Sequence, residues 1–349
     1  MSLETLETLG QIGIYIFAFL FGITIGSFLN VCIYRIPRGE SLTKRNSHCT
    51  TCGAEIKHRD LVPIFSWLFL RGKCRSCGAK ISPRYSIVES LTGILFLITF
   101  IKFDMIETGF IYPALFCLFL ASVVVVGFED FDTQEMSLSV LLVSGVIAIF
   151  SAVYANFLSN TAARGFAPDI KSSVIGALAV SLPILIIGFV ITPLLYKGFL
   201  SPDHKLRRRF QKRLRGGNLT ESENAKITKL LEEVNARITE RGAVYGFGMG
   251  DVVLMAAAGI MIGYKAVIAG TFFAVIIAAV YAVIKAKINE RRNLDTETAE
   301  TAENDINAEN SNAFAFGPFL CIGIALGAFF GNSLWGLYFS QFAQPVTYV

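Results

Sequence analysis

The chain has 349 residues, of which 53% are hydrophobic and 17% are charged. This composition is far more apolar than that of a soluble domain of the same length, and the mean hydropathy of +0.56 agrees with it. The sequence therefore indicates a polytopic membrane protein. The formal net charge of +4 is small, and it gives no reason to expect a nucleic-acid partner.

Apolar stretches of about 20 residues are long enough to cross about 30 Å of hydrocarbon. Such stretches lie at 11–34, 86–102, 109–128, 137–158, 172–196, 249–264, 266–284 and 313–332. The sequence thus predicts an all-α polytopic membrane protein of about eight transmembrane helices. Only a short Gly-Tyr-Lys turn separates the sixth span from the seventh.

The basic residues predict the orientation of these spans. No Lys or Arg precedes Arg35, so the basic region of a cleaved signal peptide is missing. The first helix is therefore expected to remain as an uncleaved transmembrane span, with its N-terminus outside. The segments that would then face the cytoplasm hold 27 of the 31 Lys and Arg residues, as the positive-inside rule requires. These cytoplasmic segments are 35–85, 129–136, 197–248 and 285–312.

A short repeat of the form C-x2-C-G-A-x-I occurs at 49–56 and again at 74–81. Each half reads as a knuckle, in which a tight turn brings two thiolates to one ion and a glycine lets backbone amides turn toward sulfur. Four thiolates fill a tetrahedral shell, so the repeat predicts a structural zinc site with the ligands Cys49, Cys52, Cys74 and Cys77. The alternative is a pair of disulfides, which a reducing cytoplasm disfavours.

Acidic residues mark the ends of two membrane spans. Asp251 opens an apolar helix; a carboxylate entering a bilayer is a functional candidate, although an Asp at a helix start is often only an N-cap. Glu129, Asp130 and Asp132 close the third span. Helical side chains are about 100° apart, so at most two of these three share a face, and we expect Asp130 to point toward the bundle. Two membrane-edge carboxylates suggest a catalytic dyad.

Glu89 lies in the first turns of the second span. It is expected either to form a local ion pair with Arg84 or to hold a cationic group of a substrate or cofactor.

The hydropathy and charge patterns divide the chain into five parts: a first transmembrane helix (1–34), a cytoplasmic cysteine module (35–85), transmembrane helices two to five (86–196), a cytoplasmic insertion (197–248), and the last three transmembrane helices (249–349). The insertion begins with a basic stretch that fits a helix on anionic headgroups, and it continues as an amphipathic helix. An acidic linker at 293–312, which has six carboxylates and no basic residue, is typical of disorder.

Taken together, the sequence resembles the bifunctional prepilin peptidases of bacteria, which are membrane aspartyl proteases of the GxGD type. The resemblance covers nearly the whole chain and keeps the order of six motifs. These motifs are Gly26-Ser27-Phe28-Leu29-Asn30-Val31 with Arg35-Ile36-Pro37, the paired Cys knuckles, Pro83-Arg84-Tyr85 with Glu89, the Asp130 segment, Gly248-x-Gly250-Asp251, and Phe316-Gly317-Pro318-Phe319.

The resemblance implies that Asp130 and Asp251 are the protease dyad at the cytoplasmic side of the bacterial inner membrane. It implies cleavage of the leader peptide from a prepilin or pseudopilin precursor of type IV pili or type II secretion, with membrane lipid as the surroundings. It also implies methylation of the new N-terminus, with S-adenosylmethionine as the donor. No donor-binding motif can be mapped, so the cofactor-binding residues stay unassigned.

Two other functions fit a membrane protein with these aspartates. One is an ion- or proton-coupled transporter that uses the aspartates as ion sites and the zinc module for docking. The other is an inactive assembly factor of a secretion system that retains the fold.

Overall fold

The computed structural model describes residues 2–43, 47–103, 109–158, 167–188, 227–231, 233–234, 248–295 and 315–342. The chain divides into two compact units, one formed by Met1–Val180 with Val253–Val349 and the other by Ser181–Val252, and each is described by itself. In the described ranges the chain is helical, and two isolated β-bridges are the only extended pairing.

Most of the described chain folds into long helices. They are α1 (Leu3–Arg35), α3 (Arg84–Lys102), α5 (Ile111–Thr133), α6 (Leu138–Val153) with the π-helix η2 (Tyr154–Leu158), α7 (Ile170–Ile186), α11 (Met249–Asp295), and α13 (Gly317–Leu326) with the π-helix η6 (Gly327–Gly331) and α14 (Asn332–Phe342). The cysteine module adds two short elements, η1 (His58–Asp60) and α2 (Phe65–Phe69).

Six helices in the described part of the chain are long and apolar enough to cross a membrane. The all-α membrane fold is thereby confirmed, whereas the count of eight spans is not. The span expected at 172–196 is described as α7 and two further residues, and its remainder lies outside the described residues. The spans expected at 249–264 and 266–284 form one element, α11.

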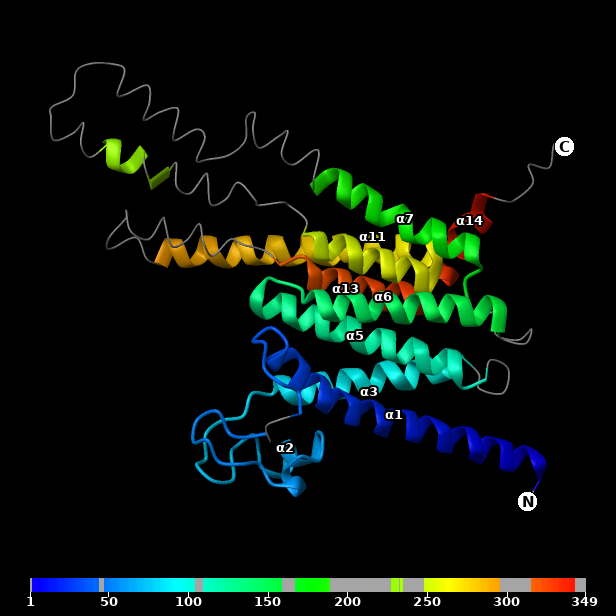
Figure 1. The fold of residues 1–349 in the computed structure, drawn as a ribbon, viewed down its shortest axis with the longest axis horizontal. Helices are drawn as coiled ribbons and strands as arrows, with labels where there is room; N and C mark the ends of the chain where they lie inside the picture. The colour runs from blue at the N-terminus through cyan, green and yellow to red at the C-terminus, as the bar shows by residue number, and fades with distance from the viewer. Residues whose placement is uncertain are drawn as a thin grey trace, which may run out of the picture. The chain divides into compact units, whose positions relative to one another are not determined.

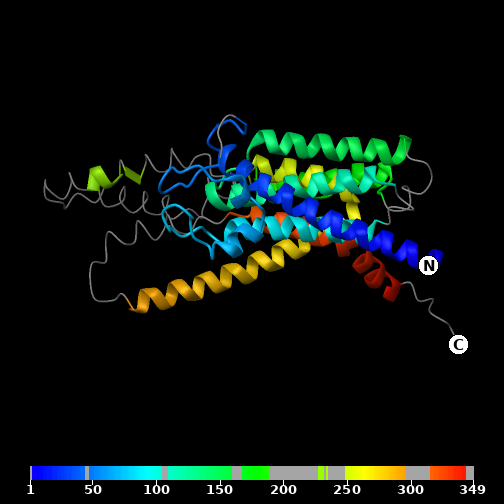
Figure 2. The same ribbon diagram turned by 90° about the horizontal axis from the view of Figure 1, so that it is seen from below.

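Helix α11 is broken at one residue. Gly263 has φ 78° and ψ 169°, which no helix allows. At this point the chain turns back along itself, from the yellow to the orange part of the ribbon (Figures 1 and 2). The division that the sequence predicted between the sixth and seventh spans therefore coincides with this break, within one or two residues.

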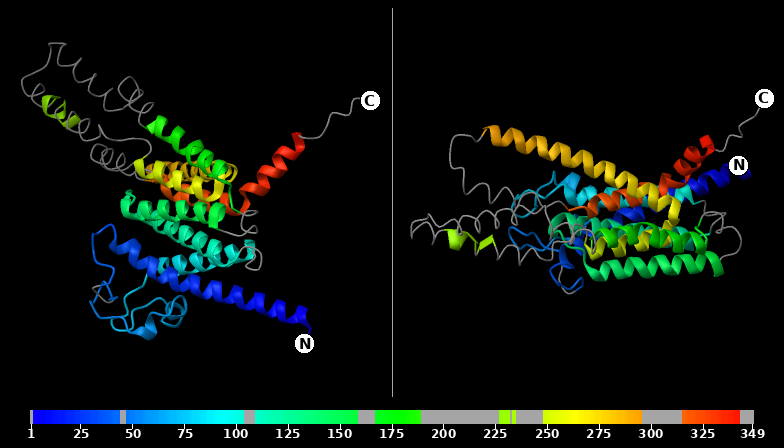
Figure 3. Two further views of the ribbon diagram at one scale, coloured as in Figure 1. Left: turned by 45° about the vertical axis from the view of Figure 1, so that its right-hand side comes forward. Right: turned by 90° about the horizontal axis from the view of Figure 1, so that it is seen from above.

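Helix α5 is the most deeply buried of the six. It contacts α1, α3, α6 and α13, so it occupies the middle of the first unit (Figure 1). An unbroken run of buried residues extends from Phe119 to Gly127. Figure 3 shows α13 running beside α5 before the chain continues into α14. The end of α5 that carries the acidic cluster is therefore enclosed by other helices.

Helices α1 and α3 approach closely at Gly26. A Cβ at Gly26 would lie only 2.7 Å from Cα of Glu89. Contacts of this kind, which let backbones approach, stabilise helix pairs in lipid through van der Waals packing. The crossing fixes the position of Glu89 against the C-terminal half of α1.

Two of the predicted segments are hardly described. Of the insertion at 197–248, the structure describes only 227–231, 233–234 and 248, and of the acidic linker at 293–312 only the first three residues, as the end of α11. The remaining residues of both segments lie outside the described residues. Their predicted amphipathic and disordered character stays a prediction.

Candidate active site

The two halves of the cysteine repeat have the same local structure. In each half the N–H of the first cysteine donates to the alanine carbonyl, over 2.9 Å at Cys49 and 2.8 Å at Cys74. The glycines that follow the second cysteines, Gly53 and Gly78, have φ of 70° and 72°. Glycine adopts this conformation without strain. The knuckle geometry expected from the spacing is therefore present twice.

The four sulfur atoms of the repeat lie within 4.8 Å of one another. The sulfurs of Cys49 and Cys77 are 3.9 Å apart, close to the separation of about 3.8 Å that Zn–S bonds of about 2.3 Å give in a tetrahedron. All seven cysteines of the chain are free thiols, so the alternative of two disulfides is wrong. The donor set and its geometry fit a closed metal site.

The thiols of this cluster differ in their acidity. Hydrogen bonds from the backbone of Cys52 and Thr51 lower the pKa of Cys49 to about 6. The backbone of Ala79 favours the thiolate of Cys77, but hydrogen bonds with the neighbouring cysteines outweigh it and raise the pKa of Cys77 to about 11. One sulfur is thus ionised at neutral pH before any metal binds.

Helix α5 continues through the acidic cluster and presents its residues to different surroundings. Asp130 is 7% exposed and Glu129 is fully buried, whereas Phe131 and Asp132 are exposed. The expected direction of Asp130 into the bundle is therefore correct. The helix ends at Thr133, and Gln134 caps it in the left-handed conformation.

Asp130 lies against the start of α13. A Cβ at Gly317 would lie 2.5 Å from Oδ2 of Asp130 and 2.9 Å from its Cγ. Pro318 occupies the first turn of α13, where a missing N–H costs no hydrogen bond. The Gly-Pro sequence starts α13, and the backbone of Gly317 lies against the carboxylate of Asp130. Within the described part of the chain, Oδ2 of Asp130 has no hydrogen-bond partner.

The other two acidic residues of the cluster have structural partners. The guanidinium of Arg84 binds Asp132 through two contacts of 2.7 Å. The N–H of Ser137 donates to Oε2 of Glu129 over 3.2 Å. One alternative from the sequence, an ion pair between Arg84 and Glu89, is therefore not formed. The guanidinium of Arg84 binds Asp132 of α5 instead. Both Asp130 and Glu129 are buried, and each has one oxygen without a hydrogen-bond partner in the described part of the chain, Oδ2 of Asp130 and Oε1 of Glu129.

Asp251 lies in the first turn of α11, in the second unit. Its side chain is 7% exposed, and its Oδ2 accepts a hydrogen bond of 2.9 Å from the N–H of Gly248. A carboxylate in the first turn that reaches back to the preceding N–H makes half of a capping box. The capping contact expected of an Asp at this position is thus real. Asp130 belongs to the first unit.

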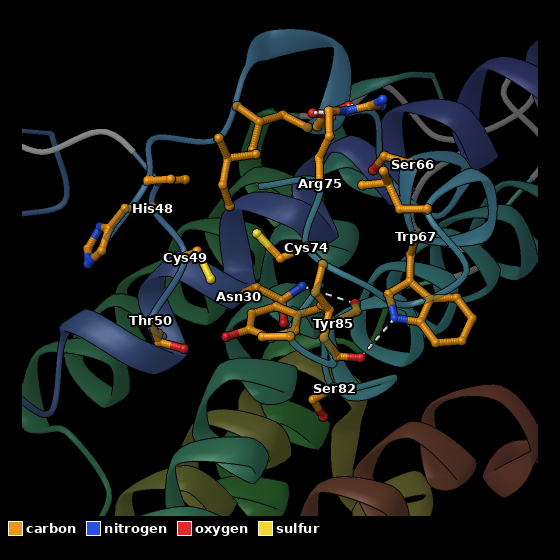
Figure 4. Close-up of a pocket in the computed structure, with 18 of the residues that line it drawn as sticks. Asn30, His48, Cys49, Thr50, Ser66, Trp67, Cys74, Arg75, Ser82 and Tyr85 are labelled. Atoms are coloured by element: carbon orange, nitrogen blue, oxygen red, sulfur yellow. Dashed lines mark hydrogen bonds and ion pairs between the residues drawn. The ribbon is translucent and has the colours of Figure 1, made fainter. Parts of the chain in front are cut away.

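A cavity of about 430 Å³ lies between the cysteine module, the C-terminal end of α1 and the N-terminal end of α3. Figure 4 shows Asn30, Trp67 and Tyr85 at its wall, with Cys49 and Cys74 of the metal cluster. The amide of Asn30 donates to the carbonyl of Tyr85 over 3.0 Å. Glu89 also lines the cavity. The sequence did not predict this cavity, since its walls come from α1, the cysteine module and α3, which come together only in the folded chain. The one available signal was the presence of the polar residues Asn30 and Glu89 within apolar spans.

Two family models match the chain. The bacterial peptidase A24 N-terminal domain matches residues 20–103, and the type IV leader peptidase family matches residues 115–283.

Three curated relatives, each named a prepilin leader peptidase/N-methyltransferase, illustrate the similarity. The chain is 40% identical to the protein of Myxococcus xanthus (strain DK1622) over 134 residues, which span 38% of this chain and only 38% of the relative. It is 32% identical to the Vibrio cholerae protein over 51% of this chain and 69% of the relative. With the Bacillus subtilis (strain 168) protein the identity is 26%, over 92% of this chain and 96% of the relative. No solved structure matches the chain.

Proposed function

The chain belongs to the type IV leader peptidase family, and we propose on this basis that it is a membrane aspartyl endopeptidase. Its substrates would be the precursors of type IV pilins or type II secretion pseudopilins, which it would cleave at the cytoplasmic face of the bacterial inner membrane. One observation carries the proposal: Asp130, inside the part that the peptidase family model matches, is buried at the end of the central membrane helix with one oxygen open.

We assign the cleavage to Asp130 and Asp251. Two carboxylates that meet in a low-dielectric site cannot both ionise cheaply, so they share one proton and titrate as a pair. The ionised carboxylate takes a proton from the water that attacks the scissile carbonyl, and the protonated one donates a hydrogen bond to the carbonyl oxygen. The proton then passes to the leaving amine. Burial of both side chains supports this role.

The second activity that we propose is methylation of the amine freed by cleavage. S-adenosylmethionine would supply the methyl group: the lone pair of the uncharged amine would form the N–C bond, the S–CH3 bond would break to release S-adenosylhomocysteine, and the amine would lose a proton to the solvent. The names of the curated relatives support this activity, since they include N-methyltransferase. The names do not specify the donor, and S-adenosylmethionine is our proposal for it.

The four cysteines would hold a zinc ion with a structural role. All four coordination positions are filled by thiolates from Cys49, Cys52, Cys74 and Cys77, which leaves none for a substrate. The ion would join the two knuckles into one rigid module, next to the cavity that they border.

Lipid is the expected surroundings of the helices, with the N-terminus outside and the dyad toward the cytoplasm. Large apolar side chains point outward from several spans, among them Phe17, Val146 and Phe272, which are 62%, 65% and 65% exposed. The distribution of basic residues supports the orientation. The transporter and the inactive assembly factor gain no support from the family or the relatives.

The test uses the purified full-length protein in detergent with a prepilin precursor, with and without S-adenosylmethionine. We expect mass spectrometry to show a shortened product in both cases and an added methyl group only with the donor. Shortening without methylation would remove the methyltransferase from the proposal. No shortening of any precursor, by a folded protein that holds its zinc, would overturn the proposal as a whole.

A further inference from the structure

An apolar surface of the cysteine module stays uncovered by the described part of the chain. It belongs to α2 and the residues beside it, 61–70, a stretch without any charged side chain. We propose that this segment lies in the headgroup and upper acyl region of the bilayer and docks the module on anionic lipid. The stretch is much shorter than the about 20 residues of a membrane span, so it lies along the surface and does not cross it.

Five large apolar side chains of this segment are exposed, and together they form its outward face. Phe69 is the most exposed of them, at 84%. The other four are Leu61, Val62, Phe65 and Leu68. Contiguous apolar surface is rare on the water-facing parts of a protein, and where it occurs it marks contact with a partner or a membrane. The outward face is therefore a surface that something other than water covers.

The opposite side of α2 is packed into the module. The indole N–H of Trp67 donates to the carbonyl of Ile81 over 3.2 Å, and a Cβ at Gly72 would lie 3.1 Å from the indole ring. Ser66 and Trp67 both border the cavity beside the cysteine knuckles (Figure 4). The exposed residues of α2 itself are three and four residues apart, which places them on one side of the helix. Helix α2 thus has one side for the module and one side for its surroundings.

The backbone at the entry to α2 fixes the direction of the helix. Ile64, the residue before it, has φ 61° and ψ −55°. A positive φ is unfavourable for a β-branched residue and persists only where the surroundings hold it. Here the N–H of Ile64 donates to Oε2 of the buried Glu89 over 2.7 Å. Helix α2 is therefore tied to α3 in a defined orientation.

This hydrogen bond places the start of α2 beside the membrane spans. Glu89 lies in the second turn of α3, and its Cα faces Gly26 of α1. Both residues lie inside candidate spans. At 1.5 Å per residue, Gly26 is about 13 Å from Arg35 along α1. In Figures 1 and 3, α2 lies on the side of α1 and α3 that faces away from α5. The exposed side of α2 is therefore next to the lipid that surrounds α1 and α3.

The charges around the outward face favour anionic lipid. Arg59 and Arg71 flank the segment at its two ends, Lys73 follows, and all three side chains are exposed. The nearby Asp60 is engaged by Arg75 through a contact of 2.6 Å. Residues 35–85 contain 11 Lys and Arg and only 3 Asp and Glu. Basic side chains beside an apolar surface are typical of a segment that lies on anionic headgroups.

The test measures whether lipid touches the outward face. The full-length protein is reconstituted into vesicles of phosphatidylglycerol and phosphatidylcholine that contain a phospholipid with a photoactivatable group on its acyl chain. After illumination, mass spectrometry maps the lipid adducts. The polar and mostly exposed stretch 50–55 of the same module is the internal reference. We expect about tenfold more adducts on 61–70 than on 50–55, because only an inserted segment meets the acyl chain.

Three substitutions at one position separate apolar contact from charge. Phe69→Glu should lower the adduct yield on 61–70 by about tenfold, because it removes apolar surface and repels anionic headgroups. Phe69→Lys removes the same surface but attracts these headgroups, so it should retain more adducts than Phe69→Glu with phosphatidylglycerol and equal numbers in vesicles of phosphatidylcholine alone. The conservative control Phe69→Leu should be labelled like the original chain. Thermal unfolding shows that each variant is folded.

Three results would overturn the inference. Adducts that are no more frequent on 61–70 than on 50–55 would mean that lipid does not reach the outward face. Equal labelling of Phe69→Glu and the original chain would mean that the contact does not depend on this face. Absent labelling, together with cross-links between 61–70 and an added prepilin precursor, would assign the face to a protein partner. The measurement involves no catalysis, so its failure would leave the proposed cleavage untouched.

Discussion

The backbone of Gly317 is packed against the carboxylate of Asp130, so closely that a Cβ at Gly317 would lie 2.5 Å from Oδ2. The two residues are far apart in sequence, on α13 and α5. The contact leaves space for nothing larger than hydrogen on this side of the carboxylate. A side chain at 317 would have to displace the group that we assign to catalysis.

We therefore predict that Gly317→Ala impairs cleavage. Overpacking of a close contact costs about 1–3 kcal/mol, and here the strain falls on Asp130 or on the methyl of Met136, which also borders the glycine. The rate of precursor cleavage should fall by tenfold or more, an order of magnitude that about 1.4 kcal/mol produces. A matched control is Gly145→Ala, where an added Cβ meets nothing within 4 Å. Equal activity of the two variants would contradict the prediction.

The ion pair between Arg84 and Asp132 connects α3 to α5, and both side chains are 34% exposed. Exposed pairs contribute about 0–1 kcal/mol, so Arg84→Gln or Asp132→Asn should lower thermal stability only slightly. If the pair holds the end of α5, the two substitutions should also lower the cleavage rate, and the double variant should be no slower than the worse single one. Independent, additive effects in this double-mutant cycle would show that the pair does not act as a unit.

Zinc binding should depend on pH in a direction that the thiols set. Coordinating thiols must be deprotonated, so affinity falls as the pH falls. Near neutral pH Cys49, with a pKa of about 6, is already a thiolate, while Cys77, with a pKa of about 11, must release its proton to the solvent. Below about pH 6 both sulfurs lose protons on binding, so the dependence becomes steeper there.

The measurement is metal competition with a chromophoric chelator at pH values on both sides of about 6, the pKa of Cys49. One zinc per chain should be found, and Cys74→Ser should lose it, whereas Cys117→Ser, which changes a buried thiol of α5, should keep it. Retention of a full equivalent of zinc by Cys74→Ser would rule out the four-thiolate site.

Local patterns in the sequence predicted much of this architecture. The cysteine repeat predicted its own knuckles, because a C-x2-C-G turn depends on neighbouring residues only. Helical periodicity showed that at most two of the three acidic residues could share a face, and the separate expectation that Asp130 points inward agrees with its 7% exposure.

Contacts between distant segments were beyond such patterns. A local ion pair between Arg84 and Glu89 was one of two alternatives that the sequence left open, whereas Arg84 binds Asp132, which is 48 residues away in sequence. Eight spans were expected and six candidate spans are found, because the two parts of α11 on either side of Gly263 count as one element and the span expected at 172–196 is described only in part. The cavity beside the cysteine module depends on how α1, α3 and the module pack, and no single segment encodes it.

The central claim is that Asp130 and Asp251 together carry out the cleavage, and the most direct test is the single-turnover cleavage rate of Asp130→Asn and Asp251→Asn. Both variants keep the size of the side chain and remove its charge, and their folding is monitored by bound zinc and thermal unfolding. Loss of a general acid or base lowers a rate by about 10²–10⁴-fold, so each variant should fall by at least a hundredfold. Cleavage at the original rate by either folded variant would contradict the account.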